Sequence, residues 1–277
     1  MKKIILGLIA LGNVGFASST SSLANVTAEN TASFVRERES TRGKKIIYVA
    51  DEFHKMATVP SFTFGAPSGL VSSWGVAFAG LSGRANSEVK DGAFAMGMGF
   101  GDSDKIGGSA SLGIGSIDPR DGGAFNRGSL NLTVGHHFKE MGAGLSLGVN
   151  NIDLWHKDDL DGDKQDPSFF TSFTKLIPNE VAPVAITGGL GNNGYVDITT
   201  DSDRKNKIGV FGAVAVYVLP QVSLVLDYTT GITTFGTSLV PFPDYPVTLN
   251  LGAGNLFKQG AEEKVSFVGS LAAAYVF

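Results

Sequence analysis

The sequence predicts an all-β protein, a closed antiparallel transmembrane barrel of about 12 strands, with about 10 to 14 compatible with the pattern. Three observations carry this prediction. Apolar residues alternate with small ones in many short runs, glycine supplies 37 of the 277 residues, and the connections between runs alternate between short and long. Because successive strand side chains point to opposite faces, each strand is expected to turn an apolar face to lipid and a small or polar face inward.

Residues 1–17 are expected to be a secretory signal peptide. Lys2 and Lys3 precede a short apolar run, and small residues stand before a plausible cut after Ala17. The run is shorter than the about 20 residues that a transmembrane helix needs. The chain has no cysteine and a net charge of −4. Export is therefore expected, thiol chemistry is excluded, and nothing points to a nucleic-acid partner.

Residues 18–72 form an N-terminal segment of different composition. Its first part, Ser18 to Ala32, is rich in Ser, Thr and Asn, and charged residues gather between Phe34 and Met56. Three interpretations are open: a periplasmic tail, a short helix that plugs the barrel lumen, or an additional strand. A disordered or loosely attached tail is the simplest of the three.

Residues 73–277 carry the strands of the predicted barrel. In one run, Gly142, Gly144, Ser146 and Gly148 alternate with apolar residues. A soluble sandwich usually has a charged face opposite its apolar face. These runs lack one, so the small residues are expected to line an interior. The strands are expected near residues 73–81, 93–101, 107–116, 127–137, 141–150, 168–176, 183–190, 208–218, 221–230, 232–239, 246–255 and 264–277.

The connections between these strands differ in length from one side to the other. Those assigned to the periplasm are short, such as 102–106 and 219–220, whereas those assigned to the outside are longer and carry much of the charge, such as 81–92 and 151–167. This asymmetry is typical of outer-membrane barrels. One connection breaks the rule, because 230–231 should be external yet is very tight.

The last strand carries a resemblance to a known class of proteins. Phe267, Leu271, Tyr275 and Phe277 share one apolar face of the strand, and the chain ends on an aromatic residue. This ending resembles the assembly signal of bacterial outer-membrane β-barrel proteins. The resemblance implies a porin-like barrel in the bacterial outer membrane, with membrane lipid and the barrel-assembly machinery as partners.

The residues expected to line the lumen are polar but mostly uncharged, and Asp227 is the one clear inward charge. The candidates are Asn131, Thr133, Ser223, Asp227, Thr248 and Asn250. They favour a passive channel for small solutes, without strong ion selectivity, without a cofactor and without catalytic residues. Because about twelve strands enclose less space than the walls of larger porins, a modest or plugged pore is expected. The oligomeric state is left open.

Two other functions are compatible with such a barrel. The first is a non-conducting structural or adhesive barrel that acts through its external loops. The second is an outer-membrane lipid-modifying enzyme, which needs a Ser–His pair near the outer rim. His136 is expected at the periplasmic end of its strand and Ser129 at the opposite end, so these two residues should not meet. The adjacent His136 and His137 are therefore interpreted as an interfacial pair.

An acidic external loop contains Asp159, Asp161 and Asp163, spaced like the start of a calcium-binding loop. Such a loop needs Gly at its sixth position and Glu at its twelfth. This chain has Lys164 and Phe170 there instead. A solvated loop is therefore expected, and these three residues are only a weak candidate for a metal site.

Overall fold

The computed structural model describes residues 56–86, 90–115, 125, 127–156, 166–178, 182–197, 207–258 and 264–277. The expected signal peptide lies outside these residues, as do residues 18–55 and the acidic-loop residues Asp159, Asp161 and Asp163.

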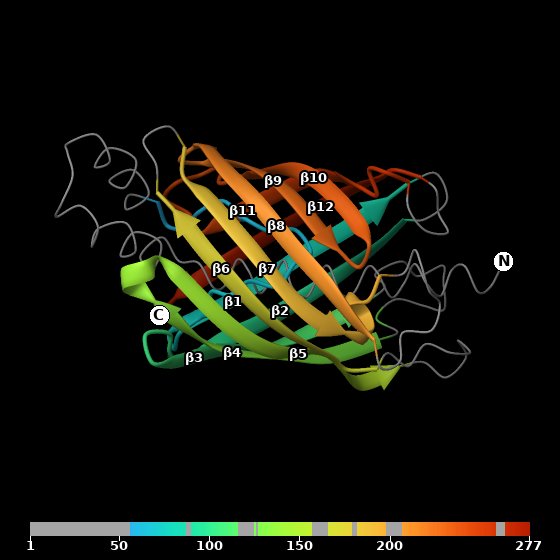
Figure 1. Cartoon of the computed structure of the whole chain (residues 1–277), viewed down its shortest axis with the longest axis horizontal. Coiled ribbons are helices and arrows are strands. Elements are labelled where there is room, and N and C mark those ends of the chain that lie inside the picture. The colour runs from blue at the N-terminus through green and yellow to red at the C-terminus, as the bar shows by residue number, and fades with distance from the viewer. Residues whose placement is uncertain are drawn as a thin grey trace.

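Twelve antiparallel strands form one closed barrel, which confirms the predicted fold class (Figure 1). Each strand pairs with its neighbours in the sequence, and the first pairs with the last. The strands are β1 (Val76–Ala85), β2 (Lys90–Asp102), β3 (Ile106–Gly115), β4 (Arg127–Phe138), β5 (Ala143–His156), β6 (Ser168–Ile177), β7 (Val184–Asn192), β8 (Ile208–Leu219), β9 (Val222–Thr229), β10 (Ile232–Leu239), β11 (Val247–Gly254) and β12 (Ser266–Val276).

Closure depends on the pairing of β1 with β12, in which Leu81 lies opposite Leu271. The sheet therefore has no free edge, which is the condition that any sheet in a bilayer must meet. The most irregular pairing is between β4 and β5, where the register shifts between Leu130 and Leu132. Asn151 has a φ of 61° there, and β5 contains the additional residues. Along β4, side chains nevertheless continue to alternate between the inner and the outer face of the barrel.

The two ends of the barrel differ. At one end, here called the turn end, the connections are short, such as 103–105 and 220–221, and one contains the 3₁₀ turn η2 (Lys139–Met141). At the other, the loop end, most connections are longer, and the one after β7 begins with η3 (Asn193–Tyr195). The tight loop-end connection at 230–231 is present as expected. Positive φ angles of 60° at Thr230 and 82° at Gly231 fit a two-residue hairpin.

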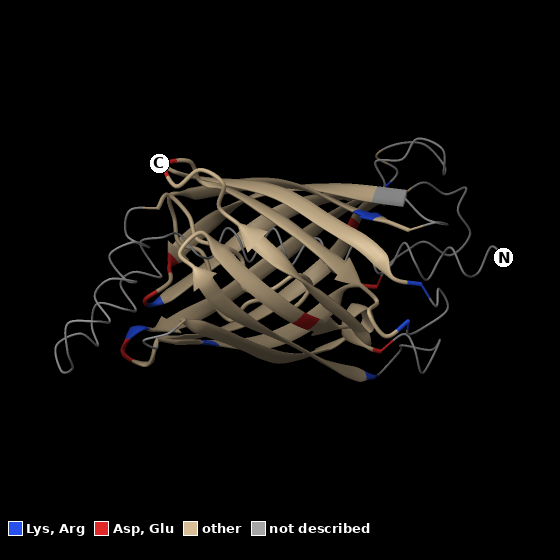
Figure 2. Ribbon diagram, turned by 90° about the horizontal axis from the view of Figure 1, so that it is seen from above, with Lys and Arg blue, Asp and Glu red and all other residues tan. Residues whose placement is uncertain are grey.

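The outer face of the barrel is apolar. Large hydrophobic side chains such as Leu147, Val210 and Phe267 are more than half exposed. Charged residues gather towards the two ends of the barrel, and most of the wall between them carries none (Figure 2). An apolar belt around a closed antiparallel barrel is the arrangement of outer-membrane barrels. Among the described residues, no helix is both long enough and apolar enough to cross a bilayer.

Residues 56–73, here called the inserted segment, lie inside the barrel and precede β1 (Figure 1, blue). They form neither a helix nor a strand. Most of their side chains are buried, and Thr63, Ala66 and Val71 are fully enclosed. The barrel core is therefore built from the inner faces of the strands together with a chain segment that belongs to none of them.

Candidate functional site

The inserted segment enters and leaves the barrel at the same end. Near its start, the backbone N–H of Ala57 donates to the carbonyl oxygen of Pro243 at 2.7 Å. At its end, the backbone N–H of Ser103 donates to Ser73 Oγ at 2.9 Å. Pro243 and Ser103 both lie in turn-end connections. The segment is therefore a loop that rises into the lumen from the turn end and returns to it.

The tip of this loop is bound to Asp227 of β9. The backbone N–H groups of residues 64–66 donate to Asp227 Oδ2 at 2.8, 3.0 and 3.0 Å. The other carboxylate oxygen, Oδ1, accepts a hydrogen bond from Thr229 Oγ1 at 2.8 Å. Successive N–H groups that converge on one anion form a backbone nest. A buried carboxylate is costly unless it is hydrogen-bonded, and this nest supplies three of its four donors.

Hydroxyl groups of the wall satisfy much of the remaining backbone of the inserted segment. A backbone outside regular structure must find such partners when it is buried. The contacts are Ser61 N–H to Ser238 Oγ at 2.8 Å, Ser223 Oγ to the Ser61 carbonyl at 2.5 Å, Ser172 Oγ to the Pro67 carbonyl at 2.6 Å, Ser146 Oγ to the Ser68 carbonyl at 2.7 Å, and Gly69 N–H to Thr174 Oγ1 at 2.8 Å. These small polar residues of the wall therefore bind the inserted segment rather than line an empty lumen.

His137 of β4 also binds the inserted segment, because its Nε2 accepts a hydrogen bond from the Val71 N–H at 2.8 Å. The side chain is buried, whereas the His136 ring packs edge-on against Phe138 with centroids 4.7 Å apart. The interpretation of the two histidines as an interfacial pair is thus wrong for His137. Since β4 keeps its period of two, His137 shares the inner face with Asn131.

Wall glycines make room for the inserted segment. A Cβ built on any one of five wall glycines would lie within 3.0 Å of an atom of the segment. The closest such distances are 2.1 Å at Gly99, 2.5 Å at Gly107, 2.7 Å at Gly135, 2.6 Å at Gly144 and 2.6 Å at Gly236. Real Cβ atoms essentially never come so close. The glycines on the inner faces therefore make room for a second chain segment, which explains why these positions carry no side chain.

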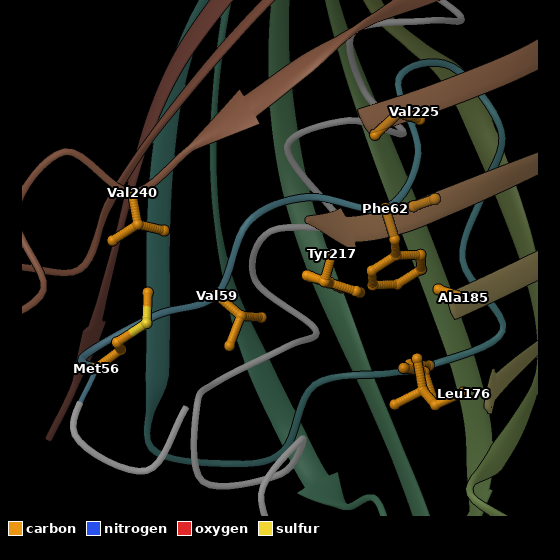
Figure 3. Packing of buried hydrophobic residues seen from close by; sticks show 10 residues of the cluster. Met56, Val59, Phe62, Leu176, Ala185, Tyr217, Val225 and Val240 are labelled. Carbon is orange, nitrogen blue, oxygen red and sulfur yellow. The ribbon is translucent and has the colours of Figure 1, made fainter. Parts of the chain in front are cut away.

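An apolar cluster joins the inserted segment to one side of the wall (Figure 3). The segment contributes Met56, Val59, Phe62 and Leu70, and the wall contributes Leu176, Ala185, Ala215, Tyr217, Val225 and Val240. All of them are at most 9% exposed. Burying such side chains is worth about 1.5–3 kcal/mol for each large one, so hydrophobic packing adds to the hydrogen bonds.

The connection after β7 meets the tip from the loop end. Tyr195 in η3 is fully buried, and its Oη accepts a hydrogen bond from Asn150 Nδ2 at 2.6 Å. Its ring lies 5.6 Å from Phe170 and 5.1 Å from Phe211 between centroids, and Ala66 of the inserted segment belongs to the same cluster. Burial raises the pKa of the Tyr195 hydroxyl, which stays protonated. Two segments from opposite ends thus meet inside the lumen.

The six candidate lumen residues are all buried, with exposed fractions between 0% and 6%: Asn131, Thr133, Ser223, Asp227, Thr248 and Asn250. The structure does not gather them into one site. Ser223 and Asp227 bind the inserted segment. Asn131 instead accepts a hydrogen bond from the Asn151 N–H, and Asn250 donates to Ser270 Oγ, each at 2.9 Å.

The four residues of the expected assembly signal lie on the outer face of β12 or at the chain end, and all are exposed: Phe267, Leu271, Tyr275 and Phe277. The Phe277 ring stacks on Tyr275 with centroids 6.4 Å apart and meets Trp74 edge-on at 6.0 Å. These contacts form an aromatic group at the turn end, where the backbone N–H of Phe277 also donates to the Gly75 carbonyl at 2.8 Å.

Sequence reasoning missed three residues of the interior. Arg127 is 8% exposed and lies on the same face of β4 as Asn131, so Asp227 is not the only inward charge. The period of two in β4 was the signal that could have identified both Arg127 and His137. Tyr195 had no comparable signal, because it belongs to a connection without strand periodicity.

No family model and no curated protein matches the sequence. Among solved structures, an outer membrane channel from Pseudomonas putida F1 has 11% identity and a TM-score of 0.47, covering 73% of this chain and 96% of that one. The KdgM porin in complex with disordered oligogalacturonate has 9% identity, a TM-score of 0.43 and coverages of 72% and 99%. Outer membrane phospholipase A from Escherichia coli has 12% identity and a TM-score of 0.42, covering 74% of this chain and 97% of that one.

These neighbours include channels and a phospholipase, so they do not separate the functions considered above. The architecture of this chain is itself informative about its location. A closed antiparallel barrel with an apolar outer belt and a largely polar interior is the form in which a sheet spans the bacterial outer membrane.

Proposed function

We propose that the protein is a passive outer-membrane channel for small solutes, closed in the described conformation by the inserted segment. The observation that carries this proposal is the nature of the attachment. Asp227 and a set of wall hydroxyls hold the backbone of the segment. Once the segment withdraws, these same side chains are left as a polar lining that water can wet, which a lumen needs in order to conduct.

Withdrawal does not require the wall to come apart. Every strand pairs with two neighbouring strands, and the β1–β12 pairing closes the barrel without help from residues 56–73. Each hydrogen bond to the segment is worth about 0.5–1.5 kcal/mol net. Proteins open locally with free energies well below that of global unfolding. The inserted segment is therefore the part of the lumen that we expect to move.

A non-conducting structural barrel is the second candidate, and the apolar cluster favours it. Phe62 of the inserted segment packs with Tyr217 and Val225, and all three side chains are at most 5% exposed. A lumen filled in this way resembles the core of a soluble domain. If the cluster keeps the segment inside the lumen at all times, the barrel acts through its surface rather than through its lumen.

Lipid-modifying catalysis receives no support from those loop-end residues that the structure describes. Asp153 Oδ2 lies 2.8 Å from His156 Nδ1. In the strand register, however, Ser129 lies opposite Asp153, whereas Arg127 lies opposite His156. Nucleophilic catalysis needs the imidazole between the serine and the carboxylate. Here the serine is paired with the carboxylate, so we propose that the protein is not an enzyme.

The test of the channel is planar-bilayer conductance of the refolded chain without residues 1–17, compared with a second form that also lacks residues 18–72. We expect rare steps from the longer form and frequent steps from the shorter one. Heat-modifiable migration on gels establishes that each barrel is folded. Silence from both folded barrels would reject the channel and leave the structural barrel as the better account.

A further inference from the structure

The described hydrogen-bond partners of the Asp227 carboxyl group carry no full charge. Its two oxygens accept hydrogen bonds from the backbone N–H groups of residues 64–66 and from the Thr229 hydroxyl. Because every partner is a donor, the side chain acts as an acceptor throughout, as an ionised carboxylate does. The negative charge is thus solvated by dipoles rather than neutralised by a cation.

The same carboxylate oxygen would be available to a solute if the tip withdrew. The three N–H donors all belong to the inserted segment, whereas Asp227 and Thr229 both belong to β9. Withdrawal would leave a carboxylate on the lumen wall with only its Thr229 bond. An unpaired charge in a narrow passage with low-dielectric walls attracts the opposite charge strongly.

We propose that the open channel selects small cationic solutes, and that Asp227 binds them in place of the segment's N–H groups. This inference rests on the proposed channel function and assigns to it a class of substrate and a means of opening. Asp227 then has two roles in sequence. It holds the tip when the channel is closed, and it recognises the solute when the channel is open.

Competition for one oxygen couples solute binding to opening. Oδ2 accepts three hydrogen bonds from the tip, and a cationic group placed there would displace them. A ligand that binds only the open state shifts the population towards that state. Couplings between two binding events of this kind are typically 5- to 150-fold. A cationic solute should therefore raise the fraction of time that the channel is open.

The buried basic side chains described inside the barrel lie away from this carboxylate in the sheet. Arg127 and His137 are both in β4, and four strands separate β4 from β9 in the barrel order. His137 is also bound to a different part of the inserted segment, at Val71. Along β9, therefore, Asp227 is the charged group that a solute in the opened lumen would meet.

The experiment is single-channel recording of the refolded chain without residues 1–17, with 1,4-diaminobutane and with 1,4-butanediol as a neutral molecule of similar shape. The variants are Asp227→Asn and, as a matched control, Asp244→Asn, which removes an exposed carboxylate from a turn-end connection. We expect the diamine to raise the open probability at least about fivefold and the diol to leave it unchanged. Reversal potentials in a KCl gradient should show a preference for cations.

Asp227→Asn should open more often than the unaltered chain without any solute, lose its response to the diamine and lose cation preference, while Asp244→Asn behaves like the unaltered chain. Equal responses to the diamine and the diol would overturn the inference, as would a cation preference that survives in Asp227→Asn. If the form lacking residues 18–72 gives conductance steps without cation preference, the inference of cation selectivity is also overturned, whereas the proposed channel function is retained. The absence of conductance steps from every folded form would reject the proposed channel function itself.

Discussion

The main chain of Gly69 passes Gly144 of β5 so closely that neither residue has room for a side chain. A Cβ on Gly144 would lie 2.6 Å from the carbonyl oxygen of Gly69, and a Cβ on Gly69 would lie 2.4 Å from that of Gly144. The two glycines together allow the main chains of the segment and the wall to approach each other.

Replacing Gly144 with Ala should loosen the inserted segment and leave the wall intact. The three atoms nearest to the new Cβ, all within 3.1 Å, belong to Gly69 and Leu70 of the segment. Overpacking of this kind costs about 1–3 kcal/mol, which here acts on the attachment of the segment. Limited proteolysis of residues 56–73 should become faster in the folded barrel.

Gly188→Ala is the matched control for that substitution, because a Cβ at Gly188 has no atom within 4 Å. It should leave the rate of proteolysis unchanged. If Gly144→Ala and Gly188→Ala behave alike, the close approach of Gly69 to β5 is not a feature of the protein in the membrane.

Removing the hydroxyls of Ser146 and Ser172 should weaken the attachment of the segment just beyond its tip. These two groups donate to the carbonyl oxygens of Ser68 and Pro67, and each loss should cost about 0.5–1.5 kcal/mol. In the double alanine variant, hydrogen exchange of the amides at residues 64–66 and 68–70 should accelerate by roughly tenfold or more. Thr171→Val, a change at a neighbouring position of β6 that faces away from the lumen, should have no effect on these amides.

Two substitutions of His137, to Leu and to Gln, should have different effects on the inserted segment. Its Nε2 accepts the Val71 N–H, so His137→Leu leaves a buried donor unsatisfied at a cost of about 1–3 kcal/mol. His137→Gln retains an acceptor and should be milder. Hydrogen exchange at Val71 measures the difference. Equal protection of Val71 in the two variants would contradict the role assigned to the imidazole.

Phe277 is predicted to matter for assembly more than for the stability of the finished barrel. Its ring is exposed and packs against Tyr275 and Trp74. Deleting Phe277 should lower the amount of folded barrel in the outer membrane of cells severalfold, while refolding of the purified chain in detergent should be little changed. Phe242→Ser, at another exposed aromatic residue of the turn end, is the control and should assemble normally.

The period of two in the sequence was enough to predict all twelve strands, because lipid outside and limited space inside impose opposite demands on successive residues. The same alternation also places Arg127 and His137 on the inner face of β4. The tight connection at 230–231 was visible as well, because Gly is favoured where φ is positive.

What fills the lumen could not be predicted in the same way. Glycines on the inner faces indicated free space, but a glycine such as Gly144 leaves the same space for water as for the backbone of Gly69. Residues 56–73 have no regular periodicity, and their partners are spread over several distant strands. Such contacts depend on the closed barrel, so no local pattern in the sequence encodes them.

The most direct test of the inserted segment is a reversible cross-link between its tip and the wall. A Cβ at position 65 would lie 3.4 Å from the Cβ of Thr229, close to the 3.5–4.5 Å range found in disulfides. The chain contains no cysteine, so the double variant Gly65→Cys, Thr229→Cys would carry only this pair. We expect the disulfide to form on mild oxidation, to abolish conductance, and to release it again on reduction. A cross-linked barrel that conducts like the reduced one would show that residues 56–73 do not close the lumen.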